Sequence, residues 1–324
     1  MPEFPRSGPA LEADVRSLAF HPQPLIHEFL YKQLVMMLAA DPGAGKSVVA
    51  TQIALSVASG IPLFGVLPVE QPSKVYYLQL EGHYAEFIER IRYMQRDLQT
   101  INYGNLAWDT SAYLNVLKDT HADALLQRIQ AWAIPDLIVL DPIYMAVSGG
   151  LSKDEPASAF ARFSNRLRQT FGCAILLVHH THRTQYLNGQ EVQEDDPFYG
   201  SQWLKAHVDI AYHLKVQNAE HSRVNLVCTK ARGKNVHKVL ALHYHPETFT
   251  CSLDYEAKSG DAMTRLISFA SRCKSEGKVT DFYETASKIQ VSHAHLRRLQ
   301  GDTSFPLYFN VVKAGGKKHL WIPC

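Results

Sequence analysis

Long apolar runs are missing from this 324-residue chain. No window reaches the roughly 18 consecutive apolar residues that a membrane-spanning helix requires. The first twenty residues include Glu3, Glu12 and Asp14 and hold no apolar stretch, so we expect no secretory signal. These absences predict a cytoplasmic protein that does not associate with a membrane.

Cysteine is scarce, and neither sign of charge dominates. The five cysteines are an odd number and lie far apart along the chain, so we expect neither a disulfide framework nor a zinc-binding pair. Lys plus Arg number 33 and Asp plus Glu number 31, and this net charge of +2 does not indicate a nucleic-acid binder by itself. Hydrophobic residues make up 46% of the chain, which excludes a fully disordered protein.

Length and local charge predict two domains and an arm. A chain of this length holds two domains at about 150 residues each. Residues 261–324 carry ten basic and five acidic side chains, a local net charge of +5, whereas the rest of the chain is slightly acidic. We therefore expect an N-terminal arm over residues 1–23, a large domain over 24–258 and a small domain over 261–324.

Apolar periodicity predicts an α/β fold with a mainly parallel sheet, because strands and helices alternate along the first half of the chain. The expected strands are 34–39, 75–80, 137–140 and 173–178, and the expected helices are 46–59, 84–98, 122–133 and 155–171. Further strands are expected at 210–215, 223–229, 239–244 and 249–253. The small domain should hold helices at 262–276, 281–289 and 292–299, followed by strands at 307–312 and 319–322.

A glycine-rich turn between the first strand and its helix matches a P-loop, although Ala40 replaces the usual first glycine. Backbone N–H groups of such a loop surround a phosphate, the lysine reaches the β- and γ-phosphates, and the hydroxyl binds Mg²⁺. The alternative is a turn that binds nothing. The predicted nucleotide-binding residues are Asp41, Pro42, Gly43, Ala44, Gly45, Lys46, Ser47 and Val48.

Two carboxylates follow buried strands and are candidates for chemistry on the phosphates. Asp141 ends the apolar run of residues 137–140 and is predicted to bind Mg²⁺ as a Walker B residue; it could instead cap a loop before Pro142. Glu81 follows the strand 75–80 and could deprotonate an attacking water, or it could only favour the N-terminus of the next helix.

Polar groups also follow two later strands. His179 and His180 come after residues 173–178; we favour a phosphate-sensing role over a zinc site, because no cysteine or carboxylate has ligand spacing. Lys230 and Arg232 come after residues 223–229, where a rigid strand end could present an arginine finger, with a solvated basic turn as the alternative.

The order of these motifs resembles the RecA-fold ATPases of the RepA-like and DnaB-like hexameric helicase group, over about residues 24–245. The similar segments are 24–26, 61–65, 75–81, 139–142, 177–181, 200–201 and 229–233. The resemblance implies ATP and Mg²⁺ as cofactors, with Glu81 activating water and His180 sensing the γ-phosphate, and with His179 as a second candidate for that sensor. It implies that Lys230 and Arg232 reach a neighbouring subunit in a hexameric ring on single-stranded DNA.

The resemblance leaves two functions open. A replicative helicase of a mobile element, working with other replication proteins, would grip DNA by loops in which Lys153 and Arg183 are the basic candidates. Residues 183–199 also contain Glu191, Glu194, Asp195 and Asp196, which would repel phosphates. The second function is therefore an ATP-dependent DNA-binding switch that does not unwind DNA.

The last 64 residues resemble a winged helix, with three helices followed by a β-wing. Helix 292–299 would be the recognition helix, and the +5 charge of the segment suits contact with the phosphates of duplex DNA. A small subunit-docking domain is the alternative. The predicted DNA-binding residues here are His295, Arg297, Arg298, Lys317 and Lys318.

Overall fold

The structure is a computed structural model. It describes residues 7–16, 23–98, 100–110, 114–180, 185–187, 190–192, 202–218, 220, 222–232, 236–254, 262–301, 305–313 and 319–323. Within these ranges, no helix is long and apolar enough to cross a bilayer.

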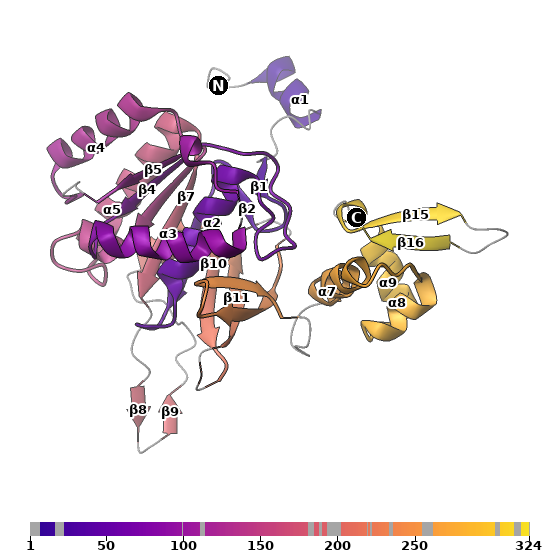
Figure 1. Cartoon of the computed structure of the whole chain (residues 1–324). Coiled ribbons are helices and arrows are strands. Elements are labelled where there is room, and N and C mark those ends of the chain that lie inside the picture. The colour runs from indigo at the N-terminus through magenta and orange to yellow at the C-terminus, as the bar shows by residue number, and fades with distance from the viewer. Residues whose placement is uncertain are drawn as a thin grey trace.

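A nine-stranded sheet forms the centre of the larger domain, with strand order β13-β12-β11-β10-β3-β7-β6-β4-β5 (Figure 1). The neighbours from β10 to β5 are parallel, and the neighbours from β10 to β13 are antiparallel. The strands are β3 (Val35–Ala40), β4 (Val75–Gln79), β5 (Leu106–Asp109), β6 (Leu137–Asp141), β7 (Ala174–His180), β10 (Ile210–Val216), β11 (Arg223–Ala231), β12 (Val239–His245) and β13 (Thr250–Leu253). The prediction of a mainly parallel α/β fold is confirmed.

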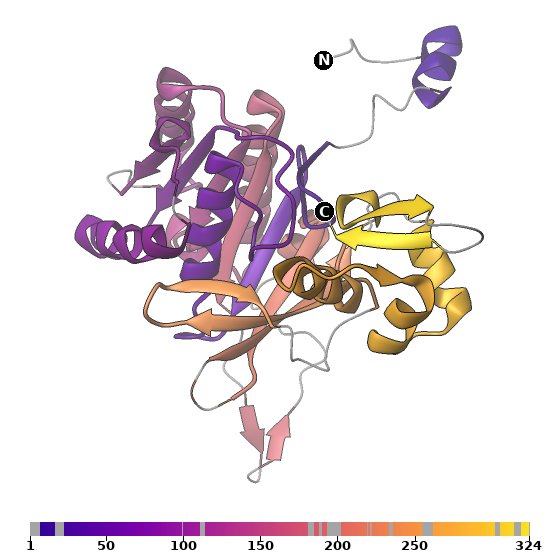
Figure 2. The ribbon, with the colours of Figure 1, turned by 45° about the vertical axis from the view of Figure 1, so that its right-hand side comes forward.

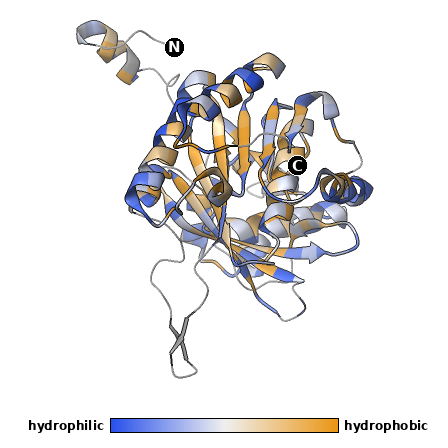
Figure 3. Cartoon of the chain, turned by 90° about the vertical axis from the view of Figure 1, so that its left-hand side faces the viewer, coloured by the Kyte–Doolittle hydropathy of each residue, from blue (hydrophilic) through white to orange (hydrophobic). Residues whose placement is uncertain are grey.

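Helices cover both faces of this sheet. Helix α2 (Lys46–Ser59) packs on the face that carries Met36, Leu38 and Val139. Helices α4 (Asp119–Trp132) and α5 (Asp154–Phe171) pack on the face that carries Val35 and Ile138. Helix α3 (Tyr84–Leu98) lies beside α2. Burial on both faces explains why the central strands are continuous apolar runs, which Figure 3 shows in orange.

Several elements differ from the expectation. Strands β6 and β7 run one to two residues further than predicted, so Asp141 and His180 end strands and do not follow them. Periodicity also missed α1 (Gly8–Arg16), β1 (Pro24–Ile26), β2 (Leu30–Tyr31), β5, β8 (Gln185–Leu187), β9 (Gln190–Val192), α6 (Gln202–His207) and the 3₁₀ helices η2 (Tyr103–Asn105) and η3 (Ile143–Ala146). These elements are short, and a few residues carry too little periodicity to identify them.

The C-terminal part is a small α+β domain built around Trp321, which is fully buried. Its elements are α7 (Ala262–Ser275), β14 (Thr280–Asp281), α8 (Phe282–Lys288), α9 (His293–Gln300), η4 (Phe305–Leu307), β15 (Phe309–Lys313) and β16 (His319–Pro323). The order of three helices followed by a β-hairpin is the order that we expected of a winged helix. Asp281 and Ser292 cap the N-termini of α8 and α9 with their side chains.

Helix α7 also connects the small domain to the sheet. The Thr264 hydroxyl donates to the Val239 carbonyl at 3.0 Å, and Met263 and Leu266 belong to the same apolar cluster as α2 and the sheet. Figure 2 shows α7 beside the antiparallel strands. The two domains therefore share packed apolar surface.

Candidate functional site

The P-loop residues lie between the end of β3 and the start of α2. Gly43 and Gly45 have φ values of 80° and 89°, a left-handed conformation that favours glycine. Gly45 is the N-cap of α2 and offers no side chain to the first helical N–H groups, so these donors are suited to bind an anion. Ala44 N–H donates to Asp41 C=O at 3.2 Å and tightens the turn.

Lys46 begins α2 and is only 7% exposed. Burial lowers the pKa of its ammonium group, while attraction to Asp141, Glu81 and Asp41 opposes that shift. A lysine at the N-terminus of a helix that follows a glycine-rich turn is suited to contact phosphate oxygens.

Asp141 lies at the carboxyl end of β6 and meets the P-loop. One of its carboxylate oxygens accepts from Ser47 Oγ at 3.2 Å, and the other accepts from the Tyr77 hydroxyl at 2.5 Å. Burial raises the pKa of this carboxyl group, and the two hydrogen bonds oppose the rise. A hydroxyl beside a carboxylate fits Mg²⁺, which takes few protein ligands when phosphates supply the others. The described residues hold no cluster of three His, Cys, Asp or Glu that would form a protein-only metal cage.

Glu81 lies just after β4 on the same side of the sheet and is exposed. Its carboxylate accepts from the Tyr144 hydroxyl at 2.6 Å. Its backbone carbonyl accepts from Gln79 Nε2 at 2.7 Å, and Gln79 is itself held by Trp108 at 2.9 Å. Backbone and side chain of Glu81 are therefore both fixed by neighbours that the sequence analysis did not identify.

His180 ends β7 and pairs with Ala40, the last residue of β3, so it lies beside the P-loop. Burial and the charge of Lys46 lower the pKa of its imidazole, and Glu81 opposes this shift. His179 is fully buried and pairs with Ala39. Of the two histidines, His180 is therefore the more exposed one, at the strand end beside the P-loop. Thr181 and His182 lie outside the described residues.

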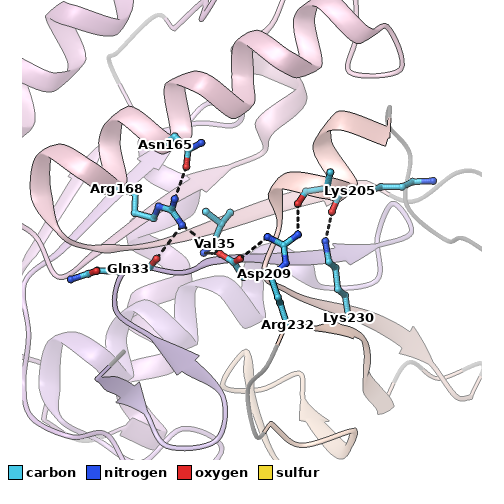
Figure 4. Close-up of polar contacts among 9 residues, drawn as sticks. Gln33, Val35, Asn165, Arg168, Lys205, Asp209, Lys230 and Arg232 are labelled. Atoms are coloured by element: carbon cyan, nitrogen blue, oxygen red, sulfur yellow. Dashed lines mark hydrogen bonds and ion pairs between the residues drawn. The ribbon is translucent and has the colours of Figure 1, made fainter. Parts of the chain in front are cut away.

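Lys230 and Arg232 lie at the other end of the sheet. Lys230 Nζ donates to the Lys205 carbonyl, and Arg232 Nη2 donates to the Ala206 carbonyl at 2.7 Å, so both cations cap the C-terminal turn of α6 (Figure 4). Arg232 also lies 3.5 Å from Asp209. Its side chain remains 58% exposed, so a second molecule can reach it.

The predicted DNA-binding residues lie in separate regions. Lys153 is exposed directly before α5. Arg297 and Arg298 are exposed on α9, where His295 is half-buried and the Arg297 guanidinium lies 5.9 Å from the Phe282 ring. Arg183, Lys317 and Lys318 lie outside the described residues.

The sequence matches a known protein-family model. A protein-family profile described as "AAA domain" matches residues 5–185. A search of the curated proteins found no match.

Solved structures with TM-scores above 0.5 share the fold at low identity. A solved ATPase domain superimposes with a TM-score of 0.54 at 14% identity, over 75% of this chain and 96% of that one. A DnaB-like replicative helicase, solved for its interactions with primase, gives 0.54 at 14% identity, over 75% of this chain and 66% of that one. A KaiC-like protein from Pyrococcus horikoshii gives 0.48 at 15% identity, over 71% and 93%.

Proposed function

Because the chain belongs to the AAA domain family, we propose that it hydrolyses ATP at the carboxyl end of its parallel sheet. The observation that carries this proposal is the contact of Ser47 with Asp141 at 3.2 Å beside the buried Lys46. Bound Mg²⁺ would neutralise charge that develops on the transferred phosphate.

The residues have distinct roles in this proposal. The N–H groups from Gly43 to Val48, together with Lys46, bind the phosphates, and Ser47 and Asp141 hold Mg²⁺. Glu81 accepts a proton from the attacking water. His180 contacts the γ-phosphate from the neighbouring strand end.

We further propose that the chain works as a hexameric ring motor on single-stranded DNA, of the RepA type found in mobile elements, together with other replication proteins. Arg232 supports a ring, because it is exposed and lies far from the P-loop of its own chain. The shared fold with the DnaB-like helicase is compatible with this assembly. A DNA-binding switch of the same fold is the second candidate, favoured by the four acidic residues between 191 and 196.

ATP turnover by matched variants tests the enzyme proposal. Glu81→Gln keeps the size of the side chain and removes its proton affinity, so turnover should fall by roughly 10²–10⁴-fold while ATP still binds. Lys46→Ala should lose both turnover and tight binding. Glu89→Gln is the control, because it makes the same substitution at an exposed glutamate of α3 that has no role in this proposal. Full turnover by Glu81→Gln would exclude Glu81 as the base.

Measurements of native mass and of DNA strand separation distinguish the ring motor from the DNA-binding switch. A motor should form a ring with ATP, hydrolyse it faster with single-stranded DNA and separate a forked duplex. A switch should change its assembly with ATP and bind DNA without separating strands.

A further inference from the structure

Tyr144 contacts two of the proposed active-site residues at once. It lies in η3, the short 3₁₀ helix that follows Asp141 and Pro142. Its hydroxyl donates to a Glu81 carboxylate oxygen at 2.6 Å. Its ring lies 5.1 Å from the His180 ring, centroid to centroid. Residues at or after the carboxyl ends of β4, β6 and β7 therefore meet at the Tyr144 side chain.

Tyr144 is well suited to hold a carboxylate in place. Burial, and next the hydrogen bond to Glu81, raise the pKa of its hydroxyl to about 12, so the group is a hydrogen-bond donor throughout the neutral range. Its helix is anchored separately, because Ile143 and Ala146 are fully buried. Glu81 is exposed, and an exposed glutamate without a partner samples several rotamers.

We propose that Tyr144 is a positioning residue: its hydroxyl holds the Glu81 carboxylate in the orientation needed to accept a proton, and its ring holds His180 beside the P-loop. This inference rests on the proposed ATPase function. It adds that Glu81 and His180 are both positioned by Tyr144. A displacement of one of these two side chains would therefore also displace the other.

A double-mutant cycle tests the hydroxyl. Tyr144→Phe removes only the oxygen, and kcat for ATP should fall roughly 10- to 100-fold, the worth of one hydrogen bond to a charged group. KM and binding of a fluorescent ATP analogue should stay unchanged. In the Glu81→Gln background, Tyr144→Phe should cost little further, because no carboxylate remains to be oriented.

Two further variants complete the test. Tyr103→Phe is the control, since it removes another tyrosine hydroxyl with a side-chain partner, Gln95 at 3.1 Å, away from the site. Tyr144→Leu removes the ring as well and should lower kcat below that of Tyr144→Phe. That extra loss should disappear in a His180→Ala background.

The outcomes separate this inference from the proposed function. Wild-type kcat in Tyr144→Phe, with Glu81→Gln inactive, would overturn the inference and leave the function standing. If Tyr144→Phe lowers kcat by the same factor in the wild-type and Glu81→Gln backgrounds, Tyr144 has a merely structural role. The same holds if a lower melting temperature accounts for the loss of kcat. Wild-type turnover in Glu81→Gln would overturn the proposed function itself.

Discussion

Lys46 and Arg232 lie at opposite ends of the same sheet. Lys46 follows the carboxyl end of β3, whereas Met36, near the start of β3, pairs with Ile210, which in turn pairs with Ala231. The stretch from Met36 to Ala40 alone spans about 13 Å at roughly 3.3 Å per residue. The Arg232 side chain therefore cannot reach phosphates at the P-loop of its own chain, and a finger role would require a second subunit.

Arg232→Ala should leave ATP binding nearly intact and lower turnover by roughly 10³-fold or more, the usual worth of an arginine finger. Steady-state ATPase assays and nucleotide titration measure the two effects. Arg223→Ala is the matched control: Arg223 is on the preceding strand β11, pairs with Asp254 at 3.3 Å and has a similarly exposed side chain. If both variants turn over ATP like the wild type, Arg232 only caps α6.

Mixing Arg232→Ala with Lys46→Ala protein should restore part of the activity. An interface can then combine an intact P-loop from one subunit with an intact arginine from the next, which neither variant can do alone. Activity should be followed across mixing ratios in a sample shown to exchange subunits. Absence of any recovery would contradict a finger acting between subunits.

Asp141→Asn should lower the affinity for Mg²⁺ by roughly tenfold or more, because a neutral amide replaces the carboxylate. The increase in ATP affinity that Mg²⁺ provides should therefore be lost. The fold should survive, since burial raises the pKa of Asp141 and a neutral side chain avoids that desolvation cost. Titration of a fluorescent nucleotide with Mg²⁺ and with EDTA measures the gain. An unchanged Mg²⁺ dependence would place the metal elsewhere.

Charge reversal on α9 tests the small domain. Replacing Arg297 and Arg298 by Glu should weaken duplex DNA binding and flatten its salt dependence, because fewer counterions are released. The same change at Arg272 and Lys274 on α7 is the control, as those two residues are also exposed and basic. Equal losses in both variants would indicate only a general charge effect, and no loss in either would favour subunit docking.

His207 should make the protein sensitive to acid. Burial, and then the charge of Arg168, lower the pKa of His207 to about 4 in the folded chain. The neutral imidazole thus contributes stability that is present above the unfolded pKa of about 6.5 and is lost as the pH falls toward about 4. At a pH of about 5 the loss amounts to about 2 kcal/mol. Urea unfolding at neutral and at mildly acidic pH should show a smaller acid effect in His207→Asn, and an identical effect would contradict the shift.

Local elements were easier to predict from the sequence than the contacts between them. Helix α2 was predicted with correct ends, because the P-loop fixes its start and Gly60, with φ of 73°, fixes its end. Strand β5 was missed: it has four residues and lies at the sheet edge, so it shows no long apolar run. No sequence pattern pointed to Tyr144, because its contact with Glu81 joins residues that are 63 positions apart in the chain. The roles of the site residues remain predictions.

The capping of α6 by Lys230 and Arg232 gives these cations two competing sets of acceptors. Within one chain they donate to the carbonyl end of a helix. In the proposed ring, a neighbour's ATP would offer phosphate oxygens, which are stronger acceptors because they are charged. Binding of ATP next door would then loosen the end of α6, and hydrolysis would restore it. The helix directly follows residues 181–201, which include Arg183, one of the two basic candidates for DNA contact. One pair of side chains would then couple this segment to the neighbour's nucleotide cycle.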